Sequence, residues 1–177
     1  YAPYMQVFVP NLSGDVQKYN VGTRPTVLVL PGGGYSFTSE RESEPIAMRF
    51  LARGCNVCIL HYTVGDTPFP VALLEALTAI RYIRENLTAW QGSADKVYVC
   101  GFSAGGHLAA LVSTYTAPVE FEGADELDEV CALPNASILC YPVIHLPDET
   151  NIAHVGSYKN LLGEDTDYAK YSPNLLV

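Results

Sequence analysis

Ser103 stands in the pattern Gly101-x-Ser103-x-Gly105, which has the spacing of a nucleophile elbow. Residues 97–100 before it form a short apolar run, and the residues after it place apolar side chains at helical spacing. Glycine permits such a tight strand-to-helix turn because it has no Cβ and tolerates unusual backbone angles. A serine at a helix N-terminus lies where free N–H groups favour developing negative charge. The pattern therefore predicts a serine nucleophile rather than a structural Gly-Ser turn.

A second chemical signal is the segment Pro31-Gly-Gly-Gly-Tyr35, which follows the apolar run 26–30. Three glycines after a buried strand indicate that the backbone itself approaches another group. The segment lacks the spacing of both common phosphate-binding loops, G-x-x-x-x-G-K-[ST] and G-x-G-x-x-G. We therefore predict an oxyanion loop that serves Ser103. Two roles remain open for Tyr35, which either lines an acyl or sugar pocket or packs the loop.

The elements that must position these residues alternate along the chain. Residues 5–10 predict an edge strand, and four apolar runs predict buried strands at 26–30, 56–60, 97–100 and 137–141. Helical spacing appears at 39–53, from Pro68 to about Leu87, and after Ser103. This order predicts a doubly wound, mostly parallel α/β sheet in three layers, with the site at the carboxyl ends of the strands. Residues 1–177 are expected to form a single domain.

Bulk properties exclude several classes of protein. The net charge of −9 argues against nucleic acid and anionic membranes as partners. No apolar run approaches the roughly 20 residues of a membrane span. The five cysteines favour free thiols in a reducing compartment, so we expect a cytoplasmic protein. A redox or zinc half-site at Cys55-x-x-Cys58 is disfavoured because no second Cys/His pair has ligand spacing, and we predict no metal site.

Several segments together carry a family resemblance, namely 31–35, 39–47, 101–110, 141–144, 161–164 and 171–173. In this order they resemble the α/β-hydrolase esterases, and within them the acetyl-esterase and acetylxylan-esterase-like lipase/esterase branch. The resemblance covers nearly the whole chain. It implies a carboxylester hydrolase without a cofactor, acting on small-molecule short acyl esters such as acetyl groups on sugars.

By position in that resemblance, Ser103 is the nucleophile. The backbone N–H groups of Gly33, Gly34 and Ala104 would form the oxyanion hole. Pro31 stands where many relatives have a histidine, which is not a triad member. A non-catalytic binding or scaffold protein of the same fold, or a peptidase of that fold, remains an alternative.

The triad order in this fold is serine, then acid, then histidine. The resemblance places the acid and the histidine beyond Val177. Within the chain, Asp148 and His154 follow Ser103 in the required order, although His154 would have to fold back over the elbow. Without a base a serine is a poor nucleophile, so residues 1–177 alone are expected to be nearly inactive.

The remaining signals concern structure. His61 precedes Ser103 and is predicted to be structural, and His107 is predicted to pack within its helix, one turn beyond the nucleophile. Glu42 either pins the glycine loop or is an ordinary charge near a helix N-terminus. A sheet that ends at the run 137–141 would expose an unpaired edge, so we expect a partner there, either a second copy or a C-terminal segment.

Overall fold

The computed structural model describes residues 2–10, 22–115, 130–145, 154–165 and 167–177. Its strands are β1 (Tyr4–Phe8), β2 (Arg24–Leu30), β3 (Asn56–His61), β4 (Gly92–Phe102) and β5 (Ala136–Cys140). Its α-helices are α1 (Glu44–Leu51), α2 (Val71–Asn86), α3 (Ala104–Thr114) and α4 (Val155–Leu162). Short 3-10 helices are η2 (Glu40–Glu42), η4 (Tyr168–Tyr171) and η5 (Pro173–Leu175).

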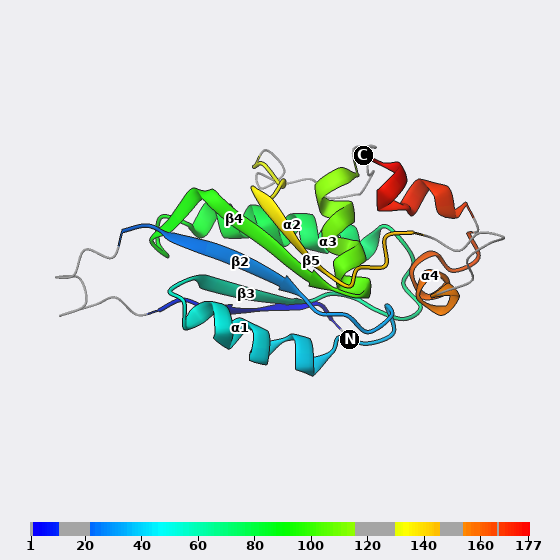
Figure 1. Ribbon diagram of the computed structural model, residues 1–177, viewed down its shortest axis with the longest axis horizontal. Helices are drawn as coiled ribbons and strands as arrows, with labels where there is room; N and C mark the ends of the chain where they lie inside the picture. The colour runs from blue at the N-terminus through cyan, green and yellow to red at the C-terminus, as the bar shows by residue number, and fades with distance from the viewer. Residues whose placement is uncertain (1, 11–21, 116–129, 146–153, 166) are drawn as a thin grey trace.

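The five strands form one sheet in the order β1-β3-β2-β4-β5 (Figure 1). Strands β2, β3, β4 and β5 run parallel, and only β1 pairs antiparallel, with β3. The prediction of a mostly parallel sheet with an edge strand near the N-terminus is confirmed. The connection after β2 leads to β3 on one side, and the connection after β4 leads to β5 on the other side. The position between β2 and β4 is therefore a topological switch point. Ligands bind in open α/β sheets at the carboxyl ends of such strands.

The two faces of the sheet carry separate cores, because successive side chains of a strand point to opposite sides. On one face, Val27, Val29 and Ile59 pack with Ala47 of α1. On the other face, alternate residues of the same strands pack against α2 and α3. The helices therefore cover both faces, as a doubly wound fold requires.

Two elements differ from the sequence expectation. The helix predicted at 39–53 is divided into η2 and α1, because Ser43 has φ −98° and ψ −107° and is not helical. Strand β4 begins at Gly92 rather than Val97, since Gly92 pairs with Arg24 of β2 beyond a register shift. That pairing is tertiary, and the polar residues between Gly92 and Val97 give no local sign of it.

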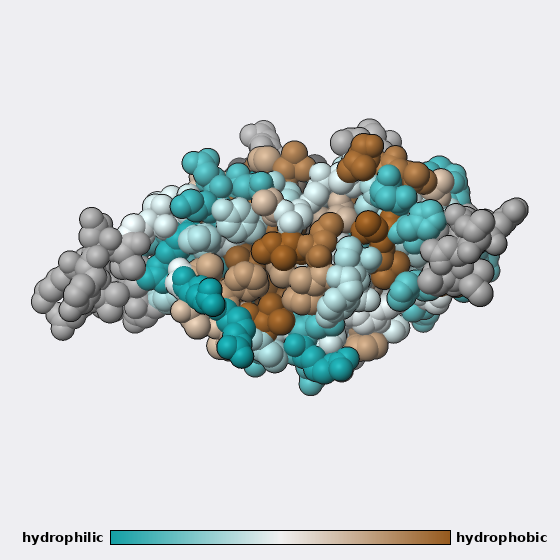
Figure 2. Space-filling view, viewed as in Figure 1, coloured by the Kyte–Doolittle hydropathy of each residue, from teal (hydrophilic) through white to brown (hydrophobic). Residues whose placement is uncertain are grey.

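Strand β5 is an edge of the sheet within the described part of the chain. Ile138 and Leu139 on it are each 40% exposed. Figure 2 shows apolar side chains gathered over the middle of the face on which β5 lies. The expected unpaired edge is thus present among the described residues.

Two glycines let α3 approach the sheet backbone to backbone. A Cβ on Gly105 would lie 2.1 Å from the carbonyl oxygen of Leu30 and 2.4 Å from that of Pro31. A Cβ on Gly101 would lie 2.1 Å from the Gly105 carbonyl oxygen. No side chain fits at these distances, so the start of α3 rests directly on the end of β2.

We predict that Gly105→Ala lowers the free energy of unfolding by at least about 2 kcal/mol, because the added methyl group must displace backbone. Gly156→Ala in α4 is the matched control, since a Cβ there meets nothing within 4 Å. Urea denaturation followed by circular dichroism measures both. Equal stability of the two variants would contradict the close packing of α3 on β2.

Candidate functional site

Ser103 has the backbone of a strained turn. Its φ of 51° and ψ of −116° lie outside the regions that residues with side chains normally occupy. Its N–H donates to the Cys140 carbonyl oxygen at 3.0 Å, and its own carbonyl oxygen accepts from the His107 N–H at 2.9 Å. Both backbone groups are therefore held from opposite sides. The hydroxyl forms no hydrogen bond with another described residue.

The glycine loop after β2 is built from left-handed backbone. Gly33, Gly34 and Tyr35 have φ values of 135°, 63° and 58°. A Cβ on Gly33 would lie 2.0 Å from the Phe37 carbonyl oxygen, so only glycine fits there. The Ser36 N–H and hydroxyl both donate to the Gly33 carbonyl oxygen, at 3.0 and 2.9 Å. These contacts close the loop into a tight turn.

This loop touches the elbow. A Cβ on Gly32 would lie 2.6 Å from the Phe102 carbonyl oxygen and 3.0 Å from the Cβ of Ser103, so no side chain fits between the loop and the elbow. The N–H groups of Gly33, Gly34 and Ala104 donate no hydrogen bond to any other described residue. The three predicted oxyanion donors thus lie on two adjoining segments, the glycine loop and the first residue of α3, and their N–H groups are unpaired among the described residues.

Glu42 connects the glycine loop to the segment after β5. Its Oε2 accepts from the Gly32 N–H at 2.8 Å, and its Oε1 accepts from the Tyr141 hydroxyl at 2.8 Å. The hydrogen bond to this carboxylate raises the pKa of Tyr141 to about 12. Of the two roles left open by the sequence, Glu42 therefore pins the loop.

Tyr35 points into the protein and is only 2% exposed. Its hydroxyl lies 2.7 Å from Nδ1 of His107, and Nε2 of His107 lies 2.8 Å from the Tyr171 carbonyl oxygen. A carbonyl oxygen only accepts, so Nε2 carries the proton and Nδ1 accepts from the phenol. Tyr35 therefore packs the loop and does not line an open pocket, and His107 packs as predicted.

Burial keeps this buried pair neutral. It lowers the pKa of His107 to about 4 and raises the pKa of Tyr35 well above its usual value. A neutral imidazole is required for Nδ1 to accept a hydrogen bond. The pair joins the glycine loop, the nucleophile helix and η4 through one directed chain of hydrogen bonds.

No described histidine side chain hydrogen-bonds to the Ser103 hydroxyl. His61 bonds to Thr38 and Gln6, which confirms its structural role, and Nδ1 of His145 lies 3.2 Å from Asn174 Nδ2. His154 is exposed at the N-cap of α4. Asp148 lies outside the described residues, so the in-chain alternative of Asp148 and His154 stays a prediction.

Helix α4 packs against the glycine loop, a contact that local sequence pattern does not predict. Asn160 Nδ2 donates to the Gly34 carbonyl oxygen at 2.8 Å, and a Cβ on Gly34 would lie 3.3 Å from Ser157 Oγ. Helical spacing at 155–162 could have indicated the helix, but not the surface on which it lies. Asn160 and Glu42 thus hold the loop at two points.

The described part of the chain gives little support for redox or metal chemistry. The five cysteines are free thiols, and burial raises the pKa of Cys58 to about 12. Within the described ranges, no three His, Cys, Asp or Glu side chains gather into a metal-binding group. Over those same residues, no helix combines the length and apolarity needed to cross a bilayer.

The chain has the α/β-hydrolase fold, with a serine elbow and a glycine loop where the sheet order reverses. The acetyl ester-xyloside bifunctional hydrolase of Caldicellulosiruptor lactoaceticus superposes with a TM-score of 0.85 at 33% identity, covering 100% of this chain and 62% of that one. The BD-FAE family model matches residues 15–165, and the chain belongs to that family.

Two curated relatives match most of the chain. Endo-1,4-beta-xylanase B of Butyrivibrio fibrisolvens is 34% identical over 160 residues, which are 88% of this chain and 24% of the relative. The acetylxylan esterase of Xylanibacter ruminicola is 32% identical over 167 residues, 89% of this chain and 32% of the relative. The chain therefore spans about a quarter to a third of the length of these relatives.

The buried neutral His107 makes stability depend on pH. Its pKa falls from 6.5 to about 4 on folding. Between these two values His107 binds a proton in the unfolded chain but not in the folded chain. Above pH 6.5 His107 adds no pH dependence to the free energy of unfolding. As the pH falls from 6.5 to 4, protonation of His107 in the unfolded chain lowers that free energy by on the order of 3 kcal/mol.

We predict that wild type and His107→Gln differ most in stability near pH 7.5, and that the difference shrinks as the pH falls toward 4.5. Urea denaturation across this range measures the difference, which cancels the titration of all other groups. A difference that stays constant with pH would contradict a buried neutral imidazole.

Proposed function

We propose that this protein is a serine carboxylesterase that cleaves short acyl esters, with acetyl groups on carbohydrate as the substrate class. The observation that carries the proposal is the contact between Ser103 on its strained turn and a glycine loop whose Gly33 and Gly34 N–H groups donate to no described residue. An acyl-transfer enzyme needs a nucleophile and hydrogen-bond donors held together in this way. The names of an acetylxylan esterase and an acetyl ester-xyloside hydrolase among similar proteins support the substrate class.

In the proposed reaction, Ser103 Oγ adds to the ester carbonyl carbon while a base takes its proton. The N–H groups of Gly33, Gly34 and Ala104 donate to the oxyanion that forms. The tetrahedral intermediate collapses, and the alcohol leaves with the proton returned by the base. Water then adds to the acyl-serine in the same manner and releases the carboxylic acid. Loss of one oxyanion donor typically costs about 10² to 10³ in turnover.

The base and its acidic partner complete the mechanism. No histidine of the described residues hydrogen-bonds to the Ser103 hydroxyl, and burial together with the two fixed hydrogen bonds removes His107 from this role. We infer that both groups come from outside the described residues. No cofactor takes part in this mechanism.

We predict that Ser103→Ala lowers the hydrolysis of p-nitrophenyl acetate by the whole protein at least about 10³-fold, because no acyl-enzyme can form. Ser113→Ala is the matched control, since Ser113 lies on the same helix and hydrogen-bonds to Ala109. The rate is followed by p-nitrophenolate absorbance. Equal rates for wild type and Ser103→Ala would overturn the proposal.

Covalent labelling separates this proposal from a non-catalytic scaffold of the same fold. We expect a fluorophosphonate to add one label to the whole protein at Ser103, because only an activated serine reacts with it. Peptide mass spectrometry locates the label, and Ser103→Ala should carry none. An unlabelled wild-type protein would favour the scaffold.

A further inference from the structure

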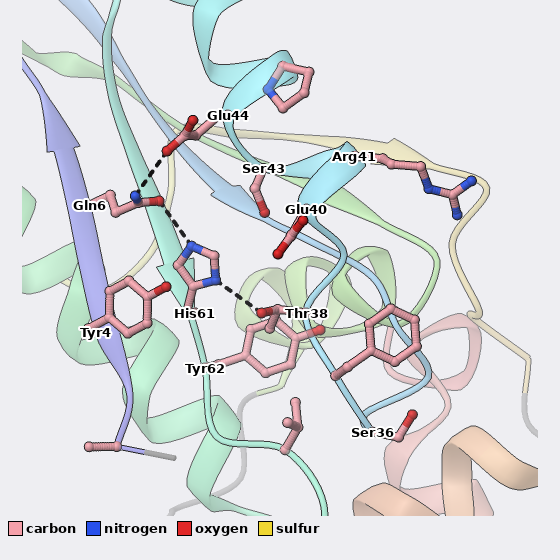
Figure 3. Close-up of a pocket in the computed structure, with 14 residues that line it drawn as sticks. Tyr4, Gln6, Ser36, Thr38, Glu40, Arg41, Ser43, Glu44, His61 and Tyr62 are labelled. Carbon is pink, nitrogen blue, oxygen red and sulfur yellow. Dashed lines mark hydrogen bonds between the residues drawn. The ribbon is translucent and has the colours of Figure 1, made fainter.

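A cavity of about 900 Å³ lies beside the glycine loop, at the carboxyl end of β3. Figure 3 shows it between β1 and β3 on one side and the segment 36–45 on the other. Neither Ser103 nor any of the proposed oxyanion donors lines it. The cavity is therefore separate from the reacting atoms, although both border the same loop.

Aromatic rings form part of its wall. Tyr4 and Phe37 are 52% and 57% exposed, so part of each ring is open to a ligand. The Tyr4 ring stacks on the His61 ring with 4.4 Å between centroids. Tyr62 is 2% exposed and anchored by its hydroxyl to the Pro31 carbonyl oxygen at 2.6 Å. The cavity thus offers fixed apolar faces that a ligand can cover.

A directed chain of hydrogen bonds holds the walls in place. Gln6 Nε2 donates to Glu44 at 3.2 Å, so Gln6 Oε1 faces His61 Nε2 at 3.0 Å and accepts from it. His61 Nδ1 then accepts from the Thr38 hydroxyl at 3.0 Å. These four side chains, which come from β1, β3, α1 and the segment before η2, form what we call the frame (Figure 3).

Three further polar groups of the lining form no hydrogen bond with a described residue, namely the Glu40 carboxylate, the Tyr4 hydroxyl and the Arg41 guanidinium. Figure 3 shows the Glu40 carboxylate turned toward Thr38 and His61, whereas the Arg41 guanidinium points away from them. An ionised carboxylate only accepts hydrogen bonds, so its natural partner is a hydroxyl donor. With Glu44 also present, the cavity disfavours an anion and suits a neutral ligand rich in hydroxyls.

The cavity lies within reach of the reaction centre. Strand β2 separates β3 from β4, and neighbouring strands lie about 4.8 Å apart, so the carboxyl ends of β3 and β4 are about 10 Å apart. Ser103 follows β4, and the cavity opens at the end of β3. A short oligosaccharide can span this distance across the glycine loop.

We propose that this cavity binds a neutral sugar unit of the same glycan whose ester Ser103 cleaves. The proposal rests on the proposed function and extends it to a second subsite. Phe37 and Tyr4 cover the apolar faces of the sugar ring, and Glu40 accepts from its hydroxyls. The frame keeps the cavity open before the ligand arrives, which reduces the entropy lost on binding.

Isothermal titration of the whole protein with unesterified xylotetraose tests the subsite without any turnover. We expect binding that Phe37→Ala and Glu40→Gln each weaken about tenfold. Glu40→Gln keeps the size of the side chain, so it reports on recognition even if Phe37→Ala disturbs the loop. Tyr82→Ala is the control, because Tyr82 is a 45% exposed aromatic residue on α2 outside the cavity.

The outcomes separate the two proposals. Absence of xylotetraose binding, or an affinity that neither cavity variant changes, overturns the subsite and leaves the esterase proposal standing if p-nitrophenyl acetate is hydrolysed. Binding that depends on Phe37 and Glu40 in a protein without esterase activity overturns the catalytic proposal alone. Tighter binding of the anionic trigalacturonate than of xylotetraose would contradict a neutral ligand.

Discussion

The direct backbone contact between α3 and the end of β2 is the constraint on which the site depends. Gly105 brings the first turn of α3 against the carbonyl oxygens of Leu30 and Pro31. The glycine loop begins where that contact ends, so Ser103 and the loop share one rigid base. Any side chain at Gly105 would push them apart. Their relative placement therefore depends on the missing Cβ of Gly105 rather than on an attractive contact between two side chains.

Besides Asn160, two hydrogen-bonded supports hold the loop on this base. Glu42 holds Gly32 from the surface, and Tyr35 reaches His107 from within. The inner support lies in the low-dielectric core, where neutral hydrogen bonds are strong and charge is costly. The outer support uses a carboxylate that water can still reach. Each support thus uses the kind of hydrogen bond that its surroundings favour.

Local pattern predicted much of this molecule. The elbow at Ser103, the glycine loop, the order of strands and helices, and the packing roles of His61 and His107 all followed from spacing and residue type. What escaped prediction depends on contacts distant in sequence. Asn160 meets Gly34 across 126 positions, and β4 extends to Gly92 through pairing with Arg24. Tyr35 was ambiguous because a buried and an exposed tyrosine look alike in a sequence.

In the proposed sugar subsite, the frame of Gln6, Thr38, His61 and Glu44 would hold the walls while other side chains recognise the ligand. Its members satisfy one another, whereas the Phe37 ring, the Glu40 carboxylate and the Tyr4 hydroxyl form no hydrogen bond with a described residue. Substitutions that change only these groups leave the hydrogen bonds of the frame in place. Ligand preference can therefore drift during evolution at little cost to folding, while the cavity itself keeps its shape. Natural variation among related proteins should accordingly concentrate on the groups that face the ligand.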